Sequence, residues 1–150
     1  MPSFTTEQIR EISEQLDSGF LAFYHKVSGE LIFLPDTDRY MDMETDAWQE
    51  DIEKLKKKRS QYQQVEAMHT KDSFNVMVDF AEQVSDANLK SELLDALDRK
   101  KPFRHFKYVI DNSPGFRQSW FDFKNNSYIE WTKDQLKIHE ELEVIKKAND

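Results

Sequence analysis

The stretch FLAFYHKVSGELIFL, residues 20–34, decides the fold that we predict for this chain. Two runs rich in aromatic and aliphatic side chains flank the pair Ser28-Gly29. A pair that ends in glycine between two such runs is typical of a two-residue hairpin turn. We therefore expect two antiparallel strands, over residues 20–27 and 30–34.

The register of this hairpin follows from the position of the turn. A turn at Ser28-Gly29 places Phe23 opposite Leu34, and Pro35 is expected to stop the second strand. Apolar residues fall on both faces of the hairpin, so we expect helices to cover at least one face and part of the other. Residues 61–68 are a candidate third strand.

An amphipathic helix is predicted immediately before the hairpin, over residues 5–16. Thr5 and Gln8 have the spacing of a capping box, in which each side chain binds the backbone N–H of the other residue. Apolar residues then recur at helical spacing, and Gly19 is placed to end the helix with a positive φ.

Charge changes sign in the segment that follows the hairpin. Residues 36–53 carry eight acids and residues 54–59 carry five cations, a polarity that suits the dipole of one helix. Helical spacing continues through the change of sign, at Trp48, Ile52, Leu55 and Tyr62. The acids Asp36, Asp38 and Asp42 resemble a calcium loop in spacing, but Tyr40 and Met41 occupy its ligand and glycine positions.

The second half of the chain has the pattern of a helical bundle. A helix capped by Asp72 or Ser73 is expected to run through Val84, and a second is expected to start at Ser85-Asp86. Pro102 and Pro114 suit the first turns of two further helices. The fold class is therefore α+β: an N-terminal helix and β-hairpin, with the candidate third strand, packed on a C-terminal helical bundle as a single domain over residues 1–150.

Composition excludes several functional classes. The chain has no cysteine, which removes disulfides and thiolate catalysis, and only three glycines, too few for a P-loop or a dinucleotide-binding fingerprint. No apolar run approaches the ~20 residues that span a bilayer, and the N-terminus has no basic and apolar leader. We expect a cytoplasmic, acidic protein of net charge −8, with no membrane association, no cofactor, no metal and no catalytic residue.

One segment concentrates cations and aromatic rings in this acidic chain. Residues 99–107 hold five Lys or Arg and no acid, and Phe103 and Phe106 lie among them. Such a mixture binds nucleic acids or acidic partners when its rings are exposed. The spacing of the two rings instead favours burial in the core, with Arg104 and Lys107 either covering it or pairing with nearby acids. The candidate partner-binding residues are Arg99, Lys100, Lys101, Arg104 and Lys107.

The motifs of the second half also resemble those of a bacterial group, uncharacterised protein family 0158. The resemblance rests on PFRHFK at residues 102–107 followed by WFDF at 120–123, with SFNVM at 73–77 and LLDAL at 93–97. It covers most of the chain, since the N-terminal helix and hairpin also follow the family's order. The family pattern usually closes on Trp-Leu, where this chain has Gln135-Leu136. Because the family has no assigned activity, the resemblance implies an identity and no mechanism.

Three functional hypotheses follow from the sequence. The first is a non-enzymatic cytosolic binding or regulatory module that acts through contacts with a partner protein. The second is a nucleic-acid-associated protein that uses residues 99–107, and the net charge of −8 disfavours it. An uncharacterised enzyme is the third, disfavoured because no catalytic template is matched. The sequence does not specify an oligomeric state.

Overall fold

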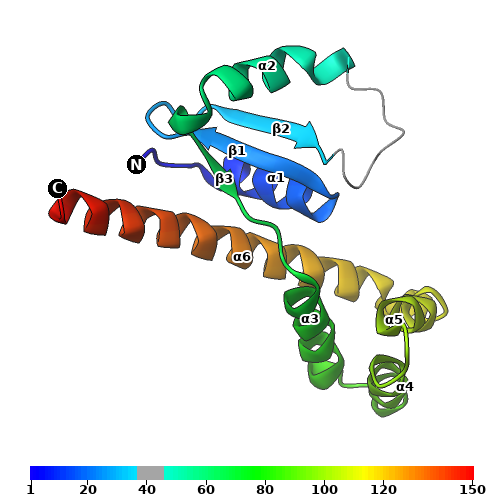
Figure 1. Cartoon of the computed structure of the whole chain (residues 1–150). Helices are drawn as coiled ribbons and strands as arrows, with labels where there is room; N and C mark the ends of the chain where they lie inside the picture. Colours follow the sequence, from blue (N-terminus) through cyan, green and yellow to red (C-terminus); the bar gives the residue numbers. More distant parts are fainter. Residues whose placement is uncertain (37–45) are drawn as a thin grey trace. The chain divides into compact units, whose positions relative to one another are not determined.

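A computed structural model describes residues 1–36 and 46–150 and confirms the α+β class (Figure 1). The chain divides into two compact units. Residues Met1–Ala67 and Tyr128–Asp150 form the first, here called the sheet unit, and Met68–Ser127 form the second, the helical unit. The long C-terminal helix contributes to both. Whether the chain folds as one domain over residues 1–150 stays a prediction.

The first helix, α1, spans Thr6–Asp17 and begins as the sequence predicts. Thr5 is its N-cap: its side-chain oxygen accepts from the N–H of Gln8, 3.1 Å away, while the Gln8 side chain accepts from the N–H of Thr5 at 2.9 Å. Two donors that the first turn would leave unpaired are thereby satisfied. Gly19 follows the helix with φ of +88°.

The hairpin forms, but its predicted turn and register are wrong. Strand β1 spans Phe20–His25 and β2 spans Leu31–Pro35, so the connection is longer than two residues and Phe23 lies opposite Ile32 rather than Leu34. His25 is the cause: its Nδ1 accepts from two N–H groups of the loop, and its carbonyl accepts from the N–H of Gly29. A shift of two residues keeps every side chain on its predicted face.

The third strand, β3, spans Tyr62–Val65 and pairs antiparallel with β1, giving the order β2-β1-β3. The helix before it, α2, spans only Gln49–Lys57, between the short 3₁₀ turns Asp46–Trp48 and Arg59–Gln61. The prediction that Tyr62 continues this helix is therefore wrong, and Tyr62 begins the strand. One sheet face packs against α2 through Phe23, Ile32, Leu34, Leu55 and Tyr62.

Helix α1 covers the other face of the sheet, where Ala22, Tyr24 and Val65 are buried (Figure 1). The C-terminal half of helix α6, which spans Pro114–Ala148, joins α1 in this unit. The Ser13 hydroxyl of α1 lies 2.8 Å from the hydroxyl of Thr132 and 3.4 Å from the carbonyl oxygen of Tyr128, both on α6. Helices thus lie on both faces of the sheet, in line with the expectation that they cover at least one face and part of the other.

The helical unit consists of α3 (Thr70–Gln83), α4 (Ala87–Leu97), α5 (Pro102–Asp111) and the first part of α6. Helix α3 begins earlier than predicted, because His69 is its N-cap and the Asp72 carboxylate accepts from the N–H of His69. Helix α4 begins where predicted, with Asp86 as its N-cap accepting from the N–H of Leu89.

Helix α6 is continuous, with no break at Asn125-Asn126. Among the helices of residues 1–36 and 46–150, none combines the length and the apolar character that crossing a membrane requires.

Candidate partner-binding surface

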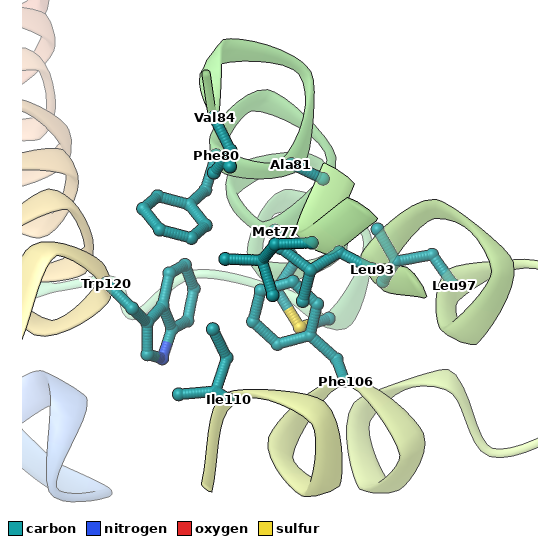
Figure 2. Close-up of a cluster of buried hydrophobic side chains, with 10 residues drawn as sticks. Met77, Phe80, Ala81, Val84, Leu93, Leu97, Phe106, Ile110 and Trp120 are labelled. Atoms are coloured by element: carbon teal, nitrogen blue, oxygen red, sulfur yellow. The ribbon is translucent and has the colours of Figure 1, made fainter. Parts of the chain in front are cut away.

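Helix α5 is fixed in the helical unit by two buried side chains, Phe106 and Ile110. The ring of Phe106 meets the indole of Trp120 in an edge-to-face arrangement with centroids 4.8 Å apart, and Phe80 packs against both rings (Figure 2). Each of these three rings is at least nine-tenths buried. The cluster sets which face of α5 turns away from the core.

The outward face of α5 combines cations and aromatic rings. Phe103 and Tyr108 are 41% and 69% exposed, and Arg104 and Lys107 are exposed between them. At 100° per residue these four positions span one side of the helix, with the two cations in the middle and a ring at each edge. We call this set, Phe103, Arg104, Lys107 and Tyr108, the α5 face.

The prediction that Phe103 belongs to the core with Phe106 is wrong for Phe103. Phe103 stands in the first turn of α5, three residues before Phe106. Phe106 is 2% exposed and faces Trp120, whereas Phe103 is 41% exposed and is not a member of the buried cluster. Apolar spacing alone does not show how far along a helix its neighbours extend.

Few acids neutralise the predicted binding residues. Arg99, in the turn that joins α4 to α5, pairs with Asp95 of α4 at 2.9 Å. Within residues 1–36 and 46–150, no ion pair is found for Lys100, Lys101, Arg104 or Lys107. Asp111, the acid at the end of α5, lies 3.8 Å from Arg117 of α6. The predicted pairing of Arg104 and Lys107 with nearby acids is thus absent among these residues.

Charge is distributed unevenly between the units. The helical unit holds nine acids and nine Lys or Arg, so the net charge of −8 belongs to the sheet unit alone. Within residues 99–127 there are seven cations and two acids. The total charge of −8 therefore does not describe the helical unit, which is neutral and carries an excess of cations over residues 99–127.

Lys101, immediately before α5, has φ of +57°, a left-handed conformation that is uncommon for residues other than glycine. No side chain caps the start of the helix. Its first free N–H groups therefore add positive potential beside Lys100 and Lys101.

The sheet unit holds a second polar arrangement, around Tyr24 and His139. The Tyr24 hydroxyl lies 3.1 Å from His139 Nδ1, on helix α6. Burial, followed by the charge of Glu143, raises the pKa of Tyr24 to about 12. Burial also lowers the pKa of His139, and Glu66 opposes this shift. The sequence offers no signal for this pair, because 115 residues separate its members.

A phenol and a neutral imidazole form one hydrogen bond in this geometry. Throughout the part of the chain that the structure describes, no group of three or more His, Asp or Glu is placed to hold a metal. Of the residues that resemble a calcium loop, Asp38, Tyr40, Met41 and Asp42 lie outside the described residues.

Comparison with known proteins gives a family and no activity. The model of the uncharacterised protein family UPF0158 matches residues 5–149. A UPF0158 protein of Pseudomonas aeruginosa is 31% identical over 72 residues, which are 48% of this chain and 47% of that protein. The match therefore spans about half the length of this relative. No solved structure matches the chain.

Proposed function

We propose that the chain, which belongs to the uncharacterised protein family UPF0158, is a non-enzymatic binding module that acts on an acidic segment of a partner protein. The α5 face is the surface we assign to this contact, with Arg99, Lys100 and Lys101 beside it. A cytosolic location, expected from the sequence, is part of the same proposal.

One observation carries the proposal: two exposed aromatic rings flank two exposed cations on a helix whose opposite side is fixed in the core. Tyr and Arg are enriched among the residues that contribute most to protein–protein binding, because they combine apolar area with hydrogen-bonding groups. A rigid helix also loses little conformational entropy when a partner binds.

The charge of the face selects the chemistry of the partner. Arg104 and Lys107 have no ion pair with a described residue, so a carboxylate that approaches them does not have to displace an existing one. The exposed rings at the edges of the face offer apolar contact area. A segment that alternates Asp or Glu with apolar side chains fits both features.

Single-stranded nucleic acid is the second candidate ligand, and the exposure of Phe103 beside Arg104 favours it. Bases stack on exposed rings while cations hold the phosphates. The burial of Phe106 counts against this candidate, because it leaves Phe103 and Tyr108, at opposite edges of the α5 face, as the exposed rings on which bases could stack. We therefore rank the acidic peptide first.

Fluorescence anisotropy with two labelled probes distinguishes the candidates: a peptide of alternating Glu and Leu, and a single-stranded oligonucleotide. We expect the peptide to bind more tightly, with an affinity that falls as salt rises. The double variant Arg104→Ala, Lys107→Ala should weaken binding and flatten its salt dependence, because two charge contacts are lost. The variant Phe103→Ala, Tyr108→Ala should weaken binding with little change in salt dependence.

The matched control is Lys56→Ala, Lys57→Ala, which removes two exposed cations from α2 and should leave binding unchanged. Micromolar or tighter, salt-sensitive binding of the oligonucleotide that both α5 double variants abolish would favour the second candidate. Failure of both probes to bind the unmodified protein would contradict the assignment of the α5 face.

A further inference from the structure

Helix α6 carries an apolar stripe near its C-terminal end that no described residue covers. Ile138, Leu142 and Ile145 are 45%, 57% and 56% exposed. Their spacing of four and three residues places them on one line along the helix. We call this line of three residues the α6 seam.

The seam is not the face by which α6 joins its own unit. Tyr128, Thr132 and Leu136 are each at most 6% exposed, and Ser13 of α1 binds the first two of them. The helix therefore has a buried face within the sheet unit and a second apolar face beside it. A helix on the surface of one folded unit needs only one apolar face, the face that packs against that unit.

From the charges beside the seam, we infer that its occupant is a second copy of this chain, with the two α6 helices parallel. The spacing of the seam is that of the two core positions of a coiled coil. Glu141 and Lys146 then take the flanking positions, five residues apart, where side chains of two parallel helices meet. Glu141 of each copy would face Lys146 of the partner subunit.

An antiparallel pair would place these charges badly. In an antiparallel pair, the residues on one side of the seam face the residues on the same side of the partner's seam. Glu141 would therefore meet the acids Glu141 and Asp134 of the partner subunit. Within residues 1–36 and 46–150, neither Glu141 nor Lys146 has a side-chain ion pair, and both side chains are exposed. The two charges are therefore available for contacts between chains.

The size of the seam predicts a weak dimer. Three apolar residues over about one heptad bury far less than the ~1,200 Å² typical of stable interfaces. We expect dissociation in the micromolar range or above. Sedimentation equilibrium over a roughly hundredfold range of protein concentration, up to ~1 mM, is the appropriate measurement.

The first test substitutes the centre of the seam. Leu142→Asp places a charge in the interface and should leave the protein monomeric at every concentration. Val144→Asp is the matched control, because Val144 is 63% exposed on the same helix but faces away from the seam. It should dimerise as the unmodified protein does. A monomeric unmodified protein at ~1 mM, or equal loss of dimer in both variants, overturns the inference.

The second test addresses orientation. Glu141→Lys should weaken the dimer on the order of fivefold, because two symmetry-related attractions become repulsions, and adding Lys146→Glu should restore it. The chain has no cysteine, so Asn149→Cys introduces a single thiol in the turn that follows α6, four residues after Ile145 of the seam. A parallel pair brings the two introduced thiols together, and mild oxidation should cross-link this variant more readily than Lys137→Cys, which lies off the seam. Equal cross-linking, or no restoration by the double charge exchange, overturns the parallel arrangement.

Discussion

The hydroxyl of Ser13 lies 2.8 Å from that of Thr132, and this hydrogen bond joins helices α1 and α6 inside the sheet unit. Both side chains are buried, with exposures of 3% and 0%. Buried polar groups are costly unless they are paired, so the pair fixes the position at which the two helices meet.

Replacing one partner tests this contact. Thr132→Val keeps the shape of the side chain and removes its hydroxyl, while Ser13 still donates to the carbonyl of Ile9. We expect the free energy of unfolding to fall by about 1 kcal/mol, the usual net contribution of one hydrogen bond. Urea denaturation measures it, and Thr70→Val, at an exposed position, is the control. A loss no larger than that of the control would show that the bond contributes nothing.

The hairpin loop depends on glycine at position 29. Gly29 has φ of +76°, and a β-carbon added there would lie 3.1 Å from the Cβ of Pro2. Gly29→Val should therefore lower the free energy of unfolding by about 1–2 kcal/mol, through both backbone strain and crowding. Gly115→Ala is the control, because the added carbon meets no atom within 4 Å other than those of its chain neighbours and its own helical backbone. Equal thermal midpoints for the two variants would be incompatible with this geometry.

Trp120 is the central ring of the helical unit, in contact with Phe80 and Phe106 (Figure 2). Trp120→Ala should cost roughly 3–5 kcal/mol, enough to unfold a domain of ordinary stability. Phe121→Ala, at the neighbouring position that is 40% exposed, should cost much less. A variant with Trp48 and Trp131 replaced by Phe allows iodide quenching of Trp120 alone. Quenching as fast as that of free tryptophan would contradict its burial.

The fold was predictable wherever local chemistry decides it. The Thr5 and Asp86 side chains accept from backbone N–H groups three residues on, and Pro102 has no N–H to leave unpaired in the first turn of α5. All three helices begin where the sequence predicts. The hairpin register was not predictable, because it depends on the ring nitrogen of His25 accepting two loop N–H groups. The turn motif Ser28-Gly29 cannot reveal that bond.

The candidate surface was predictable in its cations and not in its rings. Arg104 and Lys107 are exposed as their charge requires, whereas the exposure of Phe103 depends on where the neighbouring helices end. Tyr108 was not identified from the sequence as a binding residue. Its neighbours along the chain, exposed Lys107 and half-buried Val109, mark the edge of the apolar side of the helix. The net charge of −8 of the whole chain does not show that the helical unit is neutral, because the bounds of that unit are known only from the structure.

The stability of the chain should also depend on pH through His139. Burial lowers the pKa of this imidazole below its ordinary value of 6.5 in the folded protein, so the unfolded chain binds the proton more readily. The contribution of His139 to stability is therefore complete above about pH 6.5 and is lost as the pH falls from there towards the lower folded pKa. Protonation would also place a charge beside the Tyr24 hydroxyl, inside the sheet unit.

Urea denaturation at several values between about pH 8 and about pH 5 measures this dependence. His139→Asn removes the titrating group, and we expect its stability to vary less with pH than that of the unmodified protein, although it is lower at neutral pH because the bond to Tyr24 is altered. Thr70→Val, at an exposed position without a titrating group, is the control and should keep the unmodified pH dependence. If the free energy of unfolding varies with pH equally in the unmodified protein and in His139→Asn, the pH dependence comes from groups other than His139. The titration of the His139 ring protons in NMR spectra, which should have a midpoint below 6.5, provides the direct measurement.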